Sequence, residues 1–297
     1  MIGWVYLPLL LSLPVPAVVG TAAFRVAPAV AAWVAVATAA VAATASTICL
    51  ALLALTLCDD LPPLRVLDDR PELGLPKPVP GWVALAAALV LCAGLLRLTA
   101  LLRSRRRMLR ELRAVGEPAY GMVVADWGRP YAIAVPGRPG HVLVTSGMLR
   151  LLDDGERRVL FAHEQSHLSR RHHRLVVIVA WSAAMNPLLI PLRTMVALLV
   201  ERWADEDAAD AVGDRRLVAA TVVKASLATV GGPGSVLGLH GASTTRRVSA
   251  LVSPVSPSRG SRLVGVLVFA ALLLTVTTVA TVEFVEIARV WLTHPAR

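Results

Sequence analysis

The pentapeptide His163-Glu164-Gln165-Ser166-His167 has the spacing of a zinc-binding helix motif, H-E-x-x-H. Residues four positions apart on an α-helix lie about 40° apart around its axis, so both imidazoles can bind one Zn²⁺. Glu164 then lies beside the metal, where its carboxylate can take a proton from the attacking water. The motif predicts hydrolysis with His163 and His167 as ligands and Glu164 as general base. Histidines exposed on a charged helix are the alternative interpretation.

The residues before the motif predict the helix that it requires. Asp153 and Glu156 have the spacing of a capping box. The segment 157–162 that follows has apolar residues at a spacing compatible with a helix. We therefore expect one helix to begin near Asp153 and to carry both histidines.

A catalytic zinc ion has three protein ligands and one open position, so a third ligand must come from elsewhere. His173 follows His167 by six residues, but on a continuing helix it would point about 240° away. His172 is placed still less favourably. We interpret both as histidines that face solvent or lipid headgroups, with His173 as the weaker candidate for the third ligand.

The stronger candidate is Glu201, in the sequence Glu-Arg-Trp-Ala-Asp that ends at Asp205. We expect these residues on a helix of their own, closed by Gly213. Asp205 lies one turn after Glu201 and can accept a hydrogen bond from a ligand histidine, which would fix its tautomer. We interpret Glu206, Asp207 and Asp210 as a solvated acidic face.

The composition places this candidate site in a membrane protein. The 297 residues are 56% hydrophobic and only 17% charged, yet the net charge is +10. Soluble domains average about 45–50% apolar and 25% charged residues. An apolar excess of this size excludes a disordered chain. A disulfide scaffold is excluded because the three cysteines lie in or beside apolar runs.

Four segments are apolar and long enough to cross a bilayer, which takes about 20 residues. The first could be a cleaved signal peptide, but no basic residue precedes Arg25, so we expect a retained helix. Residues 1–103 then hold three spans and residues 263–297 the last span with a short tail. The four spans cover about 2–24, 26–58, 82–102 and 263–282.

The loop charges predict the orientation of the chain. Six arginines follow the third span between Arg103 and Arg113, whereas the loop 59–80 is rich in acidic residues. The positive-inside rule therefore predicts a plasma-membrane protein with its N-terminus outside and residues 104–262 in the cytoplasm. The arginine cluster is expected to contact anionic lipid. A direct nucleic-acid interaction is not expected, because no aromatic residues accompany the charge.

Within this cytoplasmic region, residues 120–146 contain short apolar runs separated by turn residues, which predicts two or three antiparallel strands. The remainder is predicted to be helical. Residues 231–262 are rich in Gly, Ser and Pro and predict a loop and connector. His240 and Arg246 in this segment are weaker candidates for stabilising an oxyanion.

The apolar run 175–200 is constrained by the site. If it crossed the membrane once, His167 and Glu201 would lie on opposite sides and could not share a metal. It is too short to cross twice as helices, at about 1.5 Å per residue. We therefore expect a non-crossing hairpin, re-entrant or interfacial, with its turn near Asn186-Pro187 and Pro191.

The order of these features resembles that of the membrane metallopeptidases typified by the bacterial beta-lactam sensor-transducers and antirepressors. The resemblance rests on three spans, a basic stretch, residues 144–149, H-E-x-x-H, Asn186-Pro187-Leu188, E-x-x-A-D and a last span. The chain is also similar to heat-shock and prenyl-protein membrane proteases, which share the gluzincin core. The implied fold is mainly α-helical, with about four transmembrane helices and a cytoplasmic gluzincin-like α+β domain containing a small antiparallel sheet.

The resemblance implies one Zn²⁺ per chain, held by His163, His167 and Glu201, with Glu164 as general base. It also implies that a strand at His141–Thr145 receives substrate by β-augmentation; this strand comprises His141, Val142, Leu143, Val144 and Thr145. The sensor-transducers carry an extracellular domain after the last span, and only about 15 residues follow Val282. No drug-sensing domain is therefore expected, and a stimulus would enter through the spans, the outer loop or a partner sensor.

We therefore expect a zinc endopeptidase embedded in the lipid bilayer that cleaves a cytoplasmic or membrane-associated protein. The resemblance implies a transcriptional repressor as substrate. The alternatives are a quality-control protease for membrane proteins and a zinc-binding signalling scaffold without turnover. A transport protein is disfavoured, because the four spans hold almost no ionisable residues apart from Arg97. The oligomeric state is not determined by these patterns.

Overall fold

The Ala-rich segment predicted as the second span forms α3 (Pro28–Leu55), the central helix of an apolar bundle. In this computed structural model, residues 2–23, 26–57, 79–229, 237–253 and 261–293 are described. Fourteen residues of α3 are buried, and most of these are Ala, Ser, Thr or Val. Small side chains let neighbouring helices approach closely. The helices that pack against α3 are α1 (Ile2–Ser12), α2 (Val15–Ala23), α5 (Gly81–Arg113), α8 (His172–Met185), α9 (Ile190–Val212) and α12 (Ser261–Thr293).

The first predicted span is two helices in the structure. Helix α1 ends at Ser12 and α2 begins at Val15, so the chain is interrupted around Pro14. Proline lacks the N–H group that a continuous helix needs and clashes with the preceding turn. Over the described residues 2–23, the predicted first span is therefore a broken segment.

Within the described residues, two helices are long and apolar enough to cross a membrane, α3 and α5. The last predicted span lies in α12, where the apolar stretch Gly265–Val279 is shorter. Two such helices are a weak indication of a membrane protein. Four spans and the orientation remain predictions, and residues 58–78 of the predicted outer loop lie outside the described residues.

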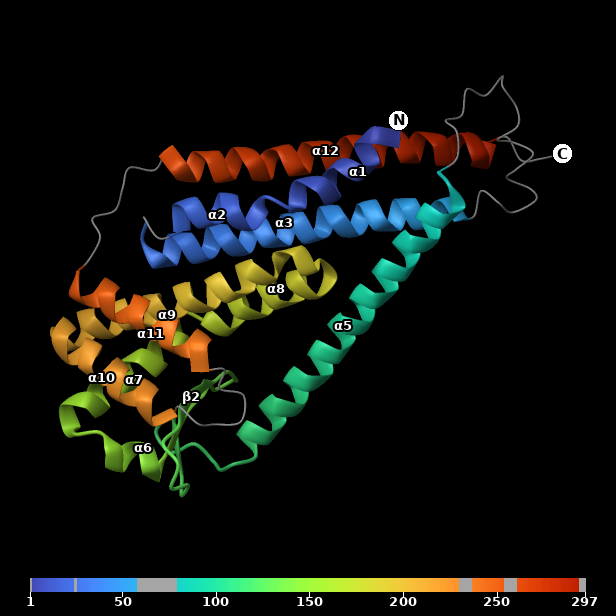
Figure 1. The fold of residues 1–297 in the computed structure, drawn as a ribbon. Helices are drawn as coiled ribbons and strands as arrows, with labels where there is room; N and C mark the ends of the chain where they lie inside the picture. The colour runs from blue at the N-terminus through green and yellow to red at the C-terminus, as the bar shows by residue number, and fades with distance from the viewer. Residues whose placement is uncertain (1, 24–25, 58–78, 230–236, 254–260, 294–297) are drawn as a thin grey trace.

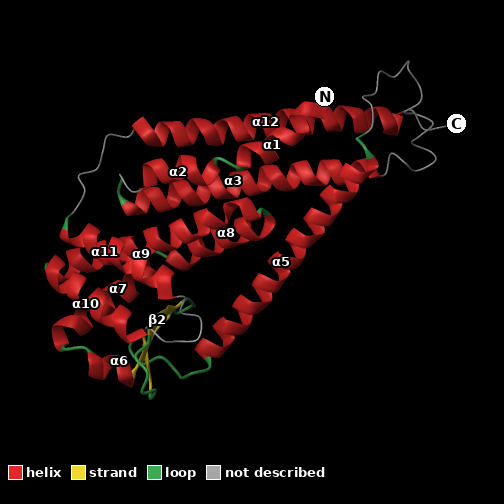
Figure 2. Cartoon of the chain, in the orientation of Figure 1, coloured by secondary structure: helices red, strands yellow, loops and turns green. Residues whose placement is uncertain are grey.

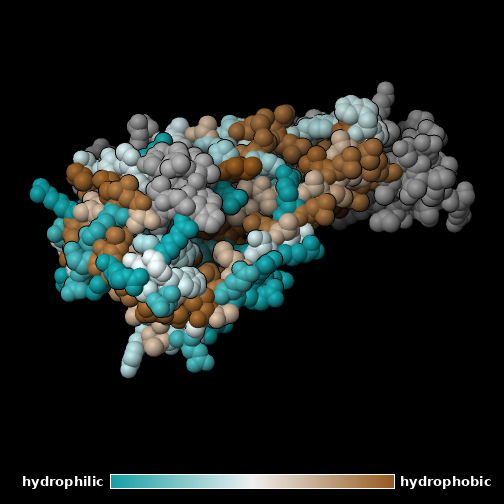
Figure 3. Space-filling model, turned by 60° about the horizontal axis from the view of Figure 1, so that its bottom comes forward, coloured by the Kyte–Doolittle hydropathy of each residue, from teal (hydrophilic) through white to brown (hydrophobic). Residues whose placement is uncertain are grey.

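The remaining elements form a domain at one end of the bundle (Figure 1). The structure is mainly helical with a small sheet (Figure 2). Hydrophobic residues dominate the narrow end of the molecule, and hydrophilic residues gather on its broad end (Figure 3). The domain contains β1 (Met122–Ala125), β2 (Ala132–Val135), β3 (His141–Thr145), α6 (Ser146–Leu151), α7 (Asp154–Ser169), α10 (Arg215–Thr229) and α11 (Leu237–Val252).

The sheet is mixed, which corrects the prediction of an antiparallel one. The strand order is β1-β3-β2. Strand β3 pairs antiparallel with β2, with Ile133 opposite Leu143, and parallel with β1, with Val123 opposite Leu143. The prediction assumed that each strand pairs with the next strand along the chain. Two chain reversals separate β1 from β3, so these two strands run in the same direction and β3 lies between the others.

Helix α7 carries the H-E-x-x-H motif and begins as predicted. Asp153 is its N-cap. Each of the side chains of Asp153 and Glu156 accepts a hydrogen bond from the backbone N–H of the other residue, which confirms the predicted capping box. Helix α9 ends at Gly213 in a left-handed conformation, as the glycine predicted. Helix α11 corrects the prediction of a connector, because Val248 and Leu251 pack into a core shared with α7, α9 and α10.

The apolar run 175–200 folds as a helical hairpin made by α8 and α9. A short 3-10 helix, η3 (Pro187–Leu189), forms the turn, and the Asn186 side chain accepts a hydrogen bond from the Leu188 N–H at 3.1 Å. Pro191 lies in the first turn of α9, where a proline is tolerated. The hairpin returns the chain to the end where it started, which brings Glu201 back to α7.

The hairpin turn is attached to α3 by one buried hydrogen bond, from Asn186 Nδ2 to Ser46 Oγ at 2.9 Å. We expect Asn186→Ala to lower the free energy of unfolding by about 1–3 kcal/mol, because the variant loses both this bond and the cap. A double-mutant cycle with Ser46→Ala, followed by thermal unfolding in detergent, should give a coupling energy of about 0.5–1.5 kcal/mol. Strictly additive effects would show that the contact does not hold the hairpin.

Candidate metal centre

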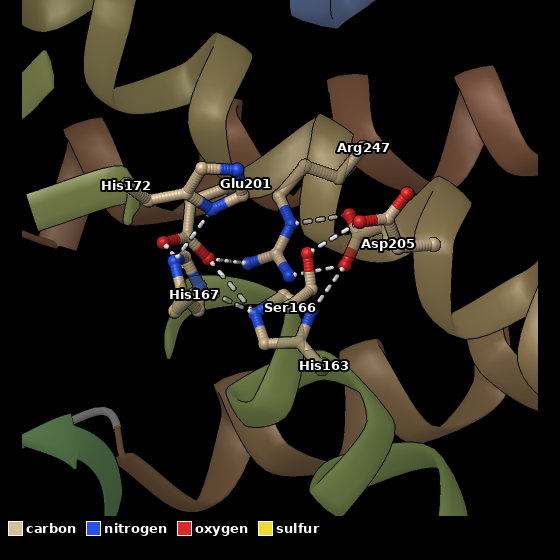
Figure 4. A network of polar contacts seen from close by, with 8 residues as sticks. His163, Ser166, His167, His172, Glu201, Asp205 and Arg247 are labelled. Carbon is tan, nitrogen blue, oxygen red and sulfur yellow. Dashed lines mark hydrogen bonds and ion pairs between the residues drawn. The ribbon is translucent and has the colours of Figure 1, made fainter. Parts of the chain in front are cut away.

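Three side chains from α7 and α9 converge on one point (Figure 4). His163 Nε2 lies 3.2 Å from His167 Nε2. The Glu201 carboxylate completes a triangle, at 3.4 Å from His163 Nε2 and 3.5 Å from His167 Nε2. These are the only residues of the described chain that form a His, Cys, Asp or Glu group of three arranged to hold a metal ion.

The dimensions of this triangle suit zinc. Two ligand atoms that are each about 2.0–2.1 Å from a tetrahedral centre lie about 3.3–3.4 Å apart. The separation of the two imidazole nitrogens, 3.2 Å, is close to this value. A different oxygen of Glu201 faces each imidazole, with Oε2 at 3.4 Å from His163 and Oε1 at 3.5 Å from His167. Two imidazoles and one carboxylate are a donor set used by catalytic zinc sites, which keep the fourth position open. The three residues therefore fit a zinc ion.

Asp205 orients the first histidine. Its carboxylate lies 3.1 Å from His163 Nδ1 and is 2% exposed. A hydrogen bond from Nδ1–H fixes the tautomer that leaves Nε2 free for a metal. The spacing of Glu201 and Asp205 on α9 places both carboxylates against α7.

Arg247 is a member of the centre that sequence reasoning missed. It reaches in from α11 and makes two hydrogen bonds to Asp205, from Nε at 2.7 Å and from Nη2 at 2.6 Å. Its Nη1 lies 3.1 Å from Glu201 Oε2. One guanidinium therefore holds both the orienting carboxylate and the third candidate ligand. The only sequence signal was a pair of adjacent arginines at 246–247, and no pattern indicated that α11 packs against α9.

Of the two oxyanion candidates of the sequence, only the side chain of Arg246 is described. Arg246, next to Arg247 on α11, is exposed. The His240 side chain lies outside the described part of the chain. His240 and Arg246 were predicted on a loop, where either side chain could have turned inward. Because α11 is a helix, the adjacent Arg246 and Arg247 point in different directions, and Arg247 is the one that faces α9.

His172 orients the second histidine, which corrects its interpretation as a solvated residue. It is 1% exposed, and its Nδ1 lies 3.0 Å from His167 Nδ1. The prediction assumed that the helix continues, whereas α7 ends at Ser169 and Arg171 is left-handed with φ 55°. That conformation costs about 1–2 kcal/mol for a residue with a side chain. The break turns His172 back toward the motif.

His173 lies on the other side of α8. The charges that act on it come from Arg105, Arg171 and Arg174, and none comes from the cluster around Glu201. Trp203 packs on the His172 ring instead, with centroids 4.6 Å apart. The structure therefore separates the two adjacent histidines, and His173 is not part of the triangle.

The acidic residues after Asp205 also differ from the prediction. Asp207 is half-buried and accepts hydrogen bonds from Ser166 at 2.7 Å and from Arg170 at 3.0 Å. Glu206 forms a bidentate pair with Arg215 at 2.7 and 2.9 Å. Asp210 is exposed, as expected for a solvated face. Glu206 and Asp207 are therefore structural partners that fasten α9 to neighbouring elements.

Glu164 lies beside the triangle against the edge of the sheet. It is buried, and its carboxylate accepts a hydrogen bond from the Ala134 N–H on β2. Burial raises the pKa of Glu164 above its usual range, and the charge of His163 partly offsets this. A carboxylate with a raised pKa next to a metal site can accept and return a proton near neutral pH.

The strand predicted to receive substrate is not available for it. Strand β3, His141–Thr145, is buried along its length and already pairs on both sides. A paired strand has no free N–H or C=O groups to offer. The edge strand next to α7 is β2. Thr145 donates to the Tyr131 carbonyl, so the alternation of antiparallel pairing directs the main-chain groups of Ala132 and Ala134 away from β3.

The charged groups of the centre set one another's protonation. Burial lowers the pKa of His163, but the hydrogen bonds with Asp205 and Glu201 outweigh it and raise the pKa to about 10. Burial lowers the pKa of His167 to about 4. Burial raises the pKa of Glu201, but His163 and Arg247 outweigh it and hold the pKa far below its usual range. Glu201 is therefore ionised and His167 is neutral, which are the states that bind metal. His163 is protonated, so metal binding at this residue releases a proton.

Comparison with known families agrees with this chemistry. Residues 97–231 match the model of Peptidase family M48, a family whose metallopeptidases are generally zinc-dependent. The matched segment holds His163, His167 and Glu201 and ends before Arg247. No curated protein and no solved structure matches the chain. The match supports an M48-type metallopeptidase, which is a hydrolase.

We expect Glu201→Ala to lose zinc, because two histidines alone leave the ion without its third ligand. Metal content of the purified chain, measured by inductively coupled plasma mass spectrometry, should fall from one zinc per chain to a small fraction. Glu206→Ala is the matched control on the same helix and should keep its zinc. Full zinc content in Glu201→Ala would assign the third ligand to another residue.

We expect Arg247→Met to weaken zinc binding about 10- to 100-fold, the usual effect of removing a group that orients a ligand. The variant leaves Asp205 buried without its cation and frees Glu201 to turn. Competition with a chelator measures the affinity, and Arg247→Lys should recover part of it. Arg246→Met, one residue away and exposed, is the control. Equal affinities for the two methionine variants would contradict the role of Arg247.

Proposed function

We propose that this chain, whose residues 97–231 match the model of Peptidase family M48, is an integral-membrane zinc endopeptidase. The observation that carries the proposal is the triangle of His163, His167 and Glu201, whose dimensions suit a tetrahedral zinc site. Glu164 lies next to this triangle with a raised pKa. Its presence favours turnover over a scaffold that only binds zinc.

The chain's own residues supply the proton transfers and the positioning. A zinc ion held by the triangle supplies a Lewis acid that polarises the scissile carbonyl and acidifies water. Glu164 accepts the proton of the attacking water and passes it to the leaving amine. Asp205 and His172 hold His163 and His167 in the required tautomers through their Nδ1 atoms. Arg247 keeps Asp205 and Glu201 in place.

A peptide substrate would pair with the free edge of β2. The main-chain groups of Ala132 and the Ala134 carbonyl face this edge, whereas the Ala134 N–H is already bonded to Glu164. An extended peptide added here would run past the general base, and its backbone hydrogen bonds would supply affinity without requiring a particular sequence. We therefore propose a protein substrate, cytoplasmic or membrane-associated, that presents an extended segment.

The bundle beside the domain supports a membrane location. Helices α3 and α5 have the length and composition of spans, and α5 enters the domain directly. The hairpin of α8 and α9 packs on α3 and keeps both its ends at the metal centre. We propose that the centre lies at the cytoplasmic membrane surface, in a multi-pass protein of the plasma membrane. A repressor in a signalling pathway is the substrate that the sensor-transducer likeness favours.

We expect Glu164→Gln to keep its zinc and to lose peptidase activity by about 10²- to 10⁴-fold, since the amide cannot accept the proton. Activity is measured on an unfolded protein in detergent, and zinc content in the same preparation. Glu117→Gln, an exposed glutamate before the sheet, is the matched control. Undiminished proteolysis in Glu164→Gln would overturn the mechanism.

The same variant identifies the substrate. Comparative proteomics of cells carrying the native chain or Glu164→Gln would show a cleavage product that is absent from the variant. A cleaved DNA-binding repressor would assign the chain to signalling. Fragments of many membrane proteins would assign it to quality control.

A further inference from the structure

Three arginines and one histidine from α5 and α8 lie close enough for the arginine charges to act on the histidine. They are Arg105 on α5 with Arg171, His173 and Arg174 at the start of α8, and we call them the cationic band after the three arginines. Arg171 and Arg174 are exposed, and Arg105 and His173 are half-buried. Within the described residues, no ion pair joins any member of the band to a carboxylate, whereas Arg107 and Arg170 nearby have acidic partners.

The cationic band is unfavourable for the local structure by itself. Burial lowers the pKa of His173, and Arg105, Arg174 and Arg171 lower it further by repulsion. Three of the four residues also lie at the N-terminal end of α8, where the helix dipole disfavours positive charge and attracts anions. Neither helix stability nor ion pairing accounts for the band, which indicates an anionic partner.

The two helices place the band at one level of the molecule. Helices α5 and α8 run antiparallel where they pack. Gly94 of α5 lies so close to Met185, at the end of α8, that a Cβ added to the glycine would be 3.4 Å from the Met185 carbonyl oxygen. Arg105 acts on His173 at the other end. From this level, α8 continues as an apolar segment to Met185 for about 18 Å, at 1.5 Å per residue. Helix α5 carries Arg103 and Arg97 before it reaches Gly94. The band therefore marks the start of the apolar segment of α8.

The surface beyond this boundary is apolar and exposed. Leu96 on α5 is 70% exposed, and Trp181 on α8 is 40% exposed. At the tip of the hairpin, Leu188 and Ile190 are 41% and 53% exposed. A partner that fits both parts must carry an anionic group next to an apolar body. An anionic phospholipid has this chemistry, whereas a nucleic acid or an acidic protein lacks the apolar part.

We propose that the cationic band binds the phosphate headgroups of anionic phospholipids, whose acyl chains lie along the exposed apolar faces of α5 and α8. The inference rests on the proposed membrane location and goes beyond it by naming the lipid class and the residues. The band adjoins His172, which contacts His167. A bound headgroup would thus set the depth of the metal centre at the membrane surface.

The test uses the full chain in nanodiscs of phosphatidylglycerol and phosphatidylcholine in equal amounts. Native mass spectrometry counts the lipids of each kind that the protein retains. The band variant is Arg105→Gln/Arg171→Gln/Arg174→Gln, and a second variant has lysine at the same positions. The matched control is Arg150→Gln/Arg158→Gln/Arg216→Gln, which removes three exposed arginines on α6, α7 and α10.

We expect the native chain, the lysine variant and the control to enrich phosphatidylglycerol. The glutamine band variant should lose this preference about ten-fold or more, because each arginine near an anionic surface contributes roughly five-fold to lipid binding. Equal enrichment in the band variant and the control would overturn the inference while leaving the peptidase intact. Release of the native chain from membranes by alkaline carbonate would overturn the membrane location and the inference together, and zinc-dependent proteolysis would still be measurable.

Discussion

The buried carboxylate of Asp205 is the interaction on which the metal centre depends. It is 2% exposed and receives hydrogen bonds from His163 of α7 and from Arg247 of α11, so three helices meet at one anion. A buried charge without partners is strongly destabilising, so loss of either partner would leave the Asp205 carboxylate in an unfavourable state. Through Arg247 the same anion is connected to Glu201. The position of each candidate ligand is therefore tied to the packing of α7, α9 and α11.

The hairpin of α8 and α9 is the second constraint, and it joins the chemistry to the apolar bundle. Asn186 caps the turn and binds Ser46 of α3, so the hairpin is held against the central helix of the bundle. The hairpin carries His172 and Glu201, which contact His167 at Nδ1 and at Nε2. The candidate metal centre and the apolar bundle thus share two helices, α9 with a candidate ligand and α8 with the residue that orients His167. A movement of the bundle that shifted α8 or α9 would be felt directly at the metal centre.

Local patterns predicted the elements well wherever the signal lay within a few residues. The capping box at Asp153 and the glycine that ends α9 both act within one turn, and both are present. The convergence of His163 and His167 was also expected from spacing, because a helix fixes their separation. Patterns failed where the answer depended on distant residues. The pairing of β3 between β1 and β2 depends on the path of the whole segment, and the free edge therefore lies on β2.

The sequence by itself determined the residue types and spacing of the candidate ligands, the general base and the apolar segments, because helix geometry converts spacing into a shared face. The tertiary structure decided which groups orient those ligands. His172 reaches His167 only because the chain breaks at Arg171, and Arg247 reaches Asp205 only because α11 packs on α9. Neither contact has a local signature. A hydrogen bond between residues distant in sequence, or across a helix break, depends on the packing of complete elements.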